Sequence, residues 1–161
     1  MDAGRMKKII ERKMRKISRY LEDDQRRSEK DKFMEKYMLC EAACREILYA
    51  YNKDRKRMKK EDIQLNMQTI PSVMNKAGYQ FDKELLTAIF GSSNKRGEKS
   101  AKKLRNGIAH SFCVEDMDEA FNRRVQLHQE MDKFLKAMST PPSPQKNTRK
   151  HQNIRSPKKA A

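Results

Sequence analysis

The amino-acid sequence predicts an all-α protein, a compact bundle of about five or six helices with a basic tail behind it. Apolar residues recur at steps of three and four along most of the chain, which is the period of an amphipathic helix. Only residues 61–70 alternate in the manner of a short strand, and their neighbours favour irregular helix, so we expect no strand. With 161 residues the chain has the length of one ordinary domain. We therefore expect a helical domain over residues 1–138 and a disordered tail over 139–161.

The first helix is expected over residues 3–21. Lys and Arg surround its apolar stripe, which consists of Met6, Ile10, Met14, Ile17 and Leu21. Packing of this stripe into the bundle is the expected role, and the alternative is an amphipathic helix on a membrane surface. The polar residues 22–32 either connect this helix to the next or continue it.

A second long helix follows, with a packing stripe of steps of three and four. The chain has three cysteines, Cys40, Cys44 and Cys113, without a paired CxxC pattern or clustered histidines. Neither a disulfide framework nor a zinc site fits that pattern, so we expect no metal, and we expect Cys40 and Cys44 to be buried thiols in a reducing cytoplasm. The residues of the stripe are Phe33, Tyr37, Cys40, Cys44, Ile47 and Tyr51.

Turn and cap residues divide the middle of the chain. The charged run 53–60 is a solvated loop or a contact to RNA phosphates. Pro71 suits the start of a helix and Gly78 its end. Asp82 can cap a helix over residues 83–90, which Gly91 ends.

Two further helices complete the expected bundle. The first runs from about Glu98 to Phe112. Asp116 and Glu119 resemble a capping box. We expect the last long helix to begin there and to end at about Met138.

The charge balance favours a polyanionic partner. The formal net charge is +16, and 37% of the residues are charged. RNA is the expected partner, and the alternative is an acidic protein such as an antitoxin. No apolar run is long enough for a transmembrane span or a secretory signal, so we expect a cytoplasmic protein without membrane contact.

The hexapeptide from Arg105 to His110 combines the groups needed to cleave RNA without a metal. RNA carries its own nucleophile, the 2′-OH, so a protein has only to move protons and stabilise the crowded phosphate. A histidine such as His110 suits the first task near neutral pH, and a guanidinium such as that of Arg105 suits the second. Asn106 adds an amide directly beside the arginine.

Helical spacing limits how these side chains cooperate. Asn106 and His110 share one helical face, whereas Arg105 and His110 lie roughly 140° apart. Three arrangements are therefore possible: Arg105 reaches around the helix, the helix is irregular near Gly107, or the phosphate is shared with a second chain. Our hypothesis is the third, a phosphate shared between two chains. Arg123 and His128 have the same spacing, but His128 falls on an apolar stripe and is expected in a core or an interface.

The run Ala101-Lys-Lys-Leu-Arg-Asn-Gly-Ile-Ala-His-Ser111, late in a helical chain, resembles the motif of the HEPN superfamily (higher-eukaryote and prokaryote nucleotide-binding domains). The resemblance covers residues 1–138, and its specific part is the hexapeptide. It implies a helical bundle that dimerises, so that two Arg-Asn-x-x-x-His motifs meet in one cleft and cleave RNA without a metal. It also implies a toxin or antiviral-defence role, with His110 as acid and base, Arg105 on the phosphate and Asn106 as the orienting residue.

Together these observations predict a metal-independent endoribonuclease that acts on single-stranded RNA as a homodimer and without a cofactor. The alternatives are a noncatalytic helical binding or assembly module in a larger defence complex, and a nucleotide-modifying enzyme, for which no cofactor motif is present. The tail carries six Lys or Arg and no acid, and it either adds RNA affinity or only solubilises the chain. The residues expected to bind RNA are Lys95, Arg96, Lys99, Lys102 and Lys103.

Overall fold

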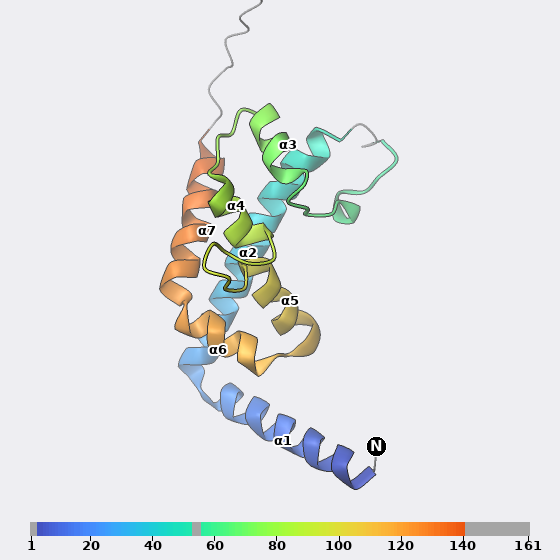
Figure 1. Cartoon of the computed structure of the whole chain (residues 1–161), viewed down its shortest axis with the longest axis vertical. Helices are drawn as coiled ribbons and strands as arrows, with labels where there is room; N and C mark the ends of the chain where they lie inside the picture. Colours follow the sequence, from blue (N-terminus) through green and yellow to red (C-terminus); the bar gives the residue numbers. More distant parts are fainter. Residues whose placement is uncertain (1–2, 53–55, 141–161) are drawn as a thin grey trace, which may run out of the picture.

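A computed structural model describes residues 3–52 and 56–140. This part of the chain is all-α and contains no strand, as predicted. It holds seven α-helices, one more than the upper expectation, and a short 3₁₀ helix at Lys60–Asp62 (Figure 1). The α-helices are α1 (Ala3–Glu22), α2 (Asp24–Ala50), α3 (Ile70–Lys76), α4 (Lys83–Phe90), α5 (Ala101–Ser111), α6 (Val114–Asn122) and α7 (Arg124–Ser139).

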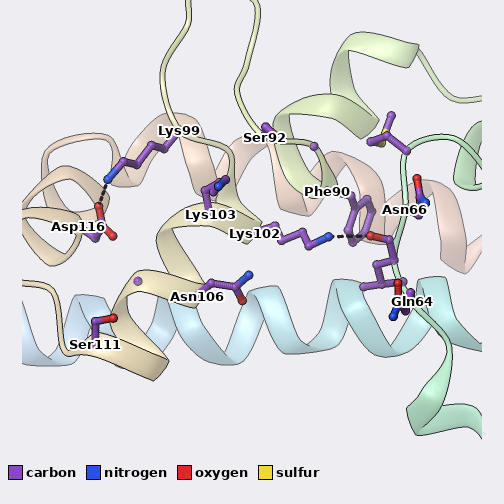
Figure 2. A pocket seen from close by; sticks show the side chains of 14 residues that line it. Gln64, Asn66, Phe90, Ser92, Lys99, Lys102, Lys103, Asn106, Ser111 and Asp116 are labelled. Carbon is purple, nitrogen blue, oxygen red and sulfur yellow. Dashed lines mark hydrogen bonds and ion pairs between the residues drawn. The ribbon is translucent and has the colours of Figure 1, made fainter.

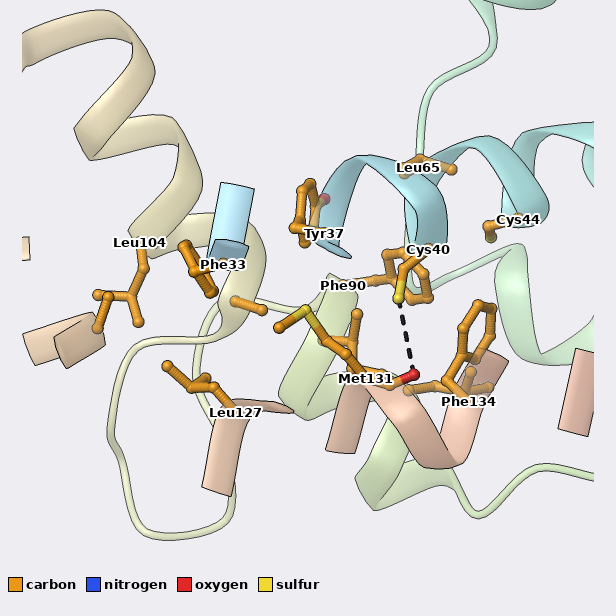
Figure 3. Close-up of a cluster of buried hydrophobic side chains, with 14 of the residues drawn as sticks. Phe33, Tyr37, Cys40, Cys44, Leu65, Phe90, Leu104, Leu127, Met131 and Phe134 are labelled. Carbon is orange, nitrogen blue, oxygen red and sulfur yellow. Dashed lines mark hydrogen bonds between the residues drawn. The ribbon is translucent and has the colours of Figure 1, made fainter. Parts of the chain in front are cut away.

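The core forms around α2, which packs along α7 and also contacts α3, α5 and α6. The predicted stripe of α2 is buried at Phe33, Tyr37, Cys40 and Cys44. Aromatic rings from other helices meet it: the ring of Phe90 lies 6.3 Å from that of Tyr37 and 5.2 Å from that of Phe134. Figure 3 shows this cluster between α2, α4, α5 and α7. The apolar period therefore predicted the inner face of α2 correctly from Phe33 to Cys44, whereas Tyr51, the last residue of the predicted stripe, follows the end of the helix and is 49% exposed.

The two cysteines of α2 are buried free thiols, as expected. Burial raises the pKa of Cys40 and of Cys44 to about 12. Both side chains are therefore neutral and packed as small apolar groups.

The expected packing of α1 into the bundle is wrong for most of its length. Met6, Ile10 and Met14 are 42%, 54% and 56% exposed, and α1 extends away from the body (Figure 1). Only Tyr20, near the end of α1, is buried. The cause is a break at Asp23, whose carboxylate accepts a hydrogen bond from the backbone N–H of Arg26 and starts α2 in a new direction.

The expected last helix from Asp116 to Met138 is also wrong. The chain forms α6 and α7 instead, which meet at Arg123. Asp116 is not a capping residue: it lies in the first turn of α6, is 5% exposed and binds Lys99. A carboxylate near a helix start has the pattern of a cap whether it faces the backbone or a neighbouring lysine, and here it faces the lysine.

The predicted caps of the shorter helices are confirmed. Pro71 lies in the first turn of α3, and Gly78 follows that helix with a left-handed φ of 89°. The carboxylate of Asp82 accepts a hydrogen bond from the backbone N–H of Glu84 at the start of α4, which ends at Gly91. The tail from residue 141 onward and residues 53–55 lie outside the described residues. No helix in residues 3–52 or 56–140 is long and apolar enough to cross a membrane.

Candidate functional site

The motif helix α5 starts three residues later than expected because Ser100 caps it. The Ser100 hydroxyl oxygen accepts a hydrogen bond from the backbone N–H of Lys103 at 3.1 Å and donates one to the carbonyl of Gly91 at 2.6 Å. Leu104 and Ile108 form the buried face of the helix. Phe112, in the left-handed conformation with φ 46°, ends it. The helix is continuous through Gly107, so an irregular turn there does not join Arg105 to His110.

Gly107 has a packing role. A Cβ atom at this position would lie 1.7 Å from Oδ2 of Asp116, so any side chain would displace that carboxylate. The other carboxylate oxygen of Asp116 lies 2.5 Å from Nζ of Lys99. The ion pair of Lys99 with Asp116 and the close approach at Gly107 hold α6, and the loop before α5, against α5. The hydrogen bond from Lys99 to Asp116 raises the pKa of Lys99.

Arg105 points toward α2. Its Nη2 lies 3.8 Å from Oε2 of Glu41, its Nη1 donates to Oδ1 of Asn106 at 3.1 Å, and its guanidinium carbon lies 6.0 Å from the centre of the Tyr37 ring. Glu41 also binds Arg45 at 3.0 Å and is only 14% exposed at its side chain. Glu41 is therefore a partly buried acid between two arginines.

His110 lies on the opposite side of α5, exposed to solvent. Lys103, Asn106 and His110 follow one another at steps of three and four residues, so they share one face of the helix. Among the described residues no hydrogen bond or ion pair joins His110 to Arg105. Within one chain the two predicted catalytic residues therefore have different surroundings: Arg105 contacts α2, and His110 is exposed to solvent.

A cleft of about 770 Å³ lies beside this face of α5. Its walls are α5, the segment 64–67 before α3, and the end of α4 (Figure 2). Nζ of Lys102 donates to the carbonyl of Leu65 at 2.7 Å and so spans the cleft. Three of the predicted RNA-binding residues meet here with one motif residue: Lys99, Lys102, Lys103 and Asn106.

The other two predicted RNA-binding residues lie elsewhere. Lys95 and Arg96 line a second cleft of about 540 Å³. This cleft also contains acidic side chains, and Nζ of Lys95 lies 3.3 Å from Glu84. The loop 92–97 therefore does not bring its cations to the motif face of α5.

Arg123 and His128, which have the same spacing as Arg105 and His110, are each held by other side chains of the fold. Arg123, 11% exposed at its side chain, forms ion pairs with Glu98 at 3.1 Å and Glu119 at 2.8 Å and donates to the carbonyl of Lys99 at 2.9 Å. His128 is 20% exposed at its side chain and lies 3.8 Å from Glu29 of α2. Burial and then the charge of Lys36 lower the pKa of His128.

Sequence reasoning missed two parts of this region. The contact of Asp116 with α5 had a signal in Gly107, a glycine inside a helical pattern, which often marks a close approach. The segment 64–67 had no signal, because an irregular segment has no period that indicates what it faces. No group of three or more His, Cys, Asp or Glu that could hold a metal ion occurs in the described part of the chain.

Comparison of the chain with family models, with curated proteins and with solved structures finds no match. The assignment of function therefore depends on the geometry of α5 and its surroundings.

Proposed function

We propose that the protein is a metal-independent endoribonuclease that cleaves single-stranded RNA. The observation that carries the proposal is the exposed His110, on the same face of α5 as Asn106 and Lys103 and next to a lysine-lined cleft. A solvent-accessible imidazole beside an electropositive cleft can exchange protons with an RNA that the lysines hold. The HEPN-like pattern of the hexapeptide supports the same chemistry.

In the proposed reaction His110 takes the proton of a ribose 2′-OH, and the 2′-oxygen forms a bond to the adjacent phosphorus. The bond from phosphorus to the 5′-oxygen then breaks, and that oxygen receives a proton from a second histidine. The products are a 2′,3′-cyclic phosphate and a 5′-OH. A guanidinium stabilises the extra negative charge of the pentacoordinate phosphorus.

The second histidine and the guanidinium come from a second chain in this proposal. Arg105 and His110 of one chain diverge by roughly 140° about the α5 axis, so a single copy presents an incomplete set. Pairing of two copies brings the His110 of one chain toward the Arg105 of the other. The functional context, a toxin or an antiviral-defence effector restrained by a partner, rests on the resemblance alone.

One observation favours a noncatalytic binding module as a second candidate. Arg105 is engaged with Glu41 and Asn106 and lies above Tyr37, which are contacts that a purely structural arginine also makes. In that case the lysine-lined cleft binds RNA or an acidic protein in a larger assembly and His110 is a surface residue.

Incubation of the purified protein with mixed RNAs in EDTA separates the two candidates. The proposal predicts cleavage, fragments with 2′,3′-cyclic phosphate and 5′-OH ends in mass spectra, and no cleavage of DNA of the same sequence, which lacks the nucleophile. Binding of RNA without cleavage would establish the noncatalytic candidate. Cleavage that requires added Mg²⁺ would contradict the metal-independent mechanism.

A further inference from the structure

The cleft beside α5 has the size of a small-ligand site. Its volume of about 770 Å³ falls in the range of about 300–1,000 Å³ that is typical of such sites. One or two nucleotides of an extended strand fit a volume of this size, whereas a turn of a base-paired helix occupies a far larger one. The cleft is therefore suited to single-stranded nucleic acid, whose bases are free to be contacted.

The lysines of the cleft differ in how much of their charge is available. Lys99 is paired with Asp116, and Lys102 donates to the backbone carbonyl of Leu65, which carries no net charge. Lys103 is exposed and forms no ion pair within residues 3–52 and 56–140. The ammonium of Lys103 is therefore the place where a phosphate gains most from entering the cleft.

The amide side chains of the cleft present donors to a ligand. Oδ1 of Asn106 already accepts a hydrogen bond from Arg105, and Oδ1 of Asn66 accepts one from the backbone N–H of Gln68 at 2.7 Å. Within the described part of the chain their amino groups have no hydrogen-bond partner and are left for other acceptors. Gln64 is exposed on the opposite wall, and Asn106 extends from α5 toward it (Figure 2). Such a wall fits the carbonyl and ring-nitrogen acceptors of a nucleobase.

The cleft is continuous with the face of α5 that carries His110. Lys103 and Asn106 line the cleft, and His110 lies one turn beyond Asn106 on the same face. From Lys103 to His110 the helix rises by about 10 Å. A strand with one phosphate at Lys103 therefore has a neighbouring phosphate within reach of His110.

We propose that this cleft is a nucleotide subsite for single-stranded RNA, in which Lys103 binds a phosphate next to the one that is cut and Gln64 and Asn66 contact the base. The inference rests on the proposed function for its ligand and for the direction of the strand. It assigns base selection to the segment 64–67, which is remote in sequence from the motif.

Binding of 2′-O-methyl decanucleotides tests the subsite separately from cleavage, since these strands lack the free 2′-OH. Fluorescence anisotropy over a salt series compares Lys103→Gln with Lys136→Gln, which removes the same charge from an exposed position of α7 outside the cleft. We expect Lys103→Gln to weaken binding about five-fold and to make the slope of log K against log salt shallower by about 0.7, the effect of one lost phosphate contact. Lys136→Gln should leave both quantities within error.

Base selection is measured with decanucleotides of adenine, cytosine or uracil. Gln64→Ala should reduce the affinity differences among the three by about five-fold or more, as expected for the loss of a base contact. Gln68→Ala is the matched control, because Gln68 directly follows the segment 64–67 but does not line the cleft. Equal binding by Lys103→Gln and Lys136→Gln, or unchanged selection in Gln64→Ala, would overturn the subsite.

The outcomes also separate this inference from the proposed function. If Lys103→Gln and Gln64→Ala behave as expected but the wild type cuts no RNA in EDTA, the subsite stands and the endoribonuclease proposal fails. If the wild type cuts RNA and both variants bind like their controls, the reaction stands and the subsite fails. A hairpin stem of the same length that binds as well as the single strand would also contradict the subsite.

Discussion

The two arginine–histidine pairs of this chain have the same spacing and opposite surroundings. Arg123 and His128 are enclosed: the arginine is held by two carboxylates, and the histidine is packed against α2. Arg105 and His110 are divided between two sides of α5, with the histidine in solvent and next to a lysine-lined cleft. Five residues of separation therefore do not define a site. What defines it is whether an acid neutralises the cation and whether a substrate can reach the imidazole.

The largest expected effect distinguishes the two histidines. His110→Ala should lower the rate of RNA cleavage in EDTA by at least about 10²-fold, which is the contribution of a general acid or base. His128→Ala should keep a rate within a few-fold of the wild type. Far-UV circular dichroism and melting curves establish that both variants are folded. Equal rates for the two variants would remove the functional difference between the pairs.

Gly107→Ala sharpens the comparison, since only the first pair contains a glycine that an acid approaches. The added methyl group must displace Asp116, so we expect unfolding in urea to require about 3 kcal/mol less free energy, despite the better helix propensity of alanine. Ala109→Gly, at an exposed position of the same helix, should cost only about 1 kcal/mol. A Gly107→Ala protein as stable as the wild type would mean that Asp116 does not pack on α5.

Arg123→Ala should act on stability and not on chemistry. It removes the ion pair with Glu98 and the hydrogen bond to the carbonyl of Lys99, which join the end of α6 to the loop before α5, and also the ion pair with Glu119 of α6. We expect the free energy of unfolding to fall by about 2 kcal/mol, which is typical for the loss of hydrogen bonds to charged groups. The rate per folded molecule should stay near that of the wild type. A rate loss as large as that of Arg105→Ala would break the distinction between the pairs.

The smallest expected effect is a pH dependence of stability from His128. Burial lowers the pKa of His128 below its unfolded value of about 6.5, so the folded protein binds this proton less readily than the unfolded chain. Its contribution to stability is present above pH of about 6.5 and is lost as the pH falls through the folded pKa. His128→Gln should flatten the fall of the melting temperature between neutral and mildly acidic pH. An unchanged slope would contradict the lowered pKa.

The period of apolar residues predicted the buried face of a helix correctly where other helices surround it. It failed where the direction of the helix in space decides whether anything packs against that face. The stripe of α2 was correct from Phe33 to Cys44 because α2 packs against α3, α5, α6 and α7. The stripe of α1 has the same spacing, but the cap at Asp23 turns the chain, so most of the stripe remains exposed. A period reports which residues share a face, and it contains no information on whether another element lies opposite that face.

The sequence predicted which residue types lie in the candidate site, but it did not predict how their side chains are arranged in space. The angle between Arg105 and His110 followed from helix geometry, and α5 runs as one continuous helix through both residues. That Arg105 contacts Glu41 required the placement of α2 against α5, which spacing along one helix cannot supply. The cleft wall at 64–67 comes from an irregular segment, and the lysines opposite it were expected only from their sequence proximity to the motif.

Subunit mixing tests most directly the central claim that two copies complete one site. Wild-type and His110→Ala chains are unfolded together in denaturant, with the variant in excess, and refolded as a mixture so that chains exchange. If two copies complete one site, the rate of RNA cleavage in EDTA per wild-type chain should be well below that of the wild type unfolded and refolded alone, because a mixed dimer lacks the second histidine. A rate per wild-type chain equal to that of the wild type alone would contradict the shared site.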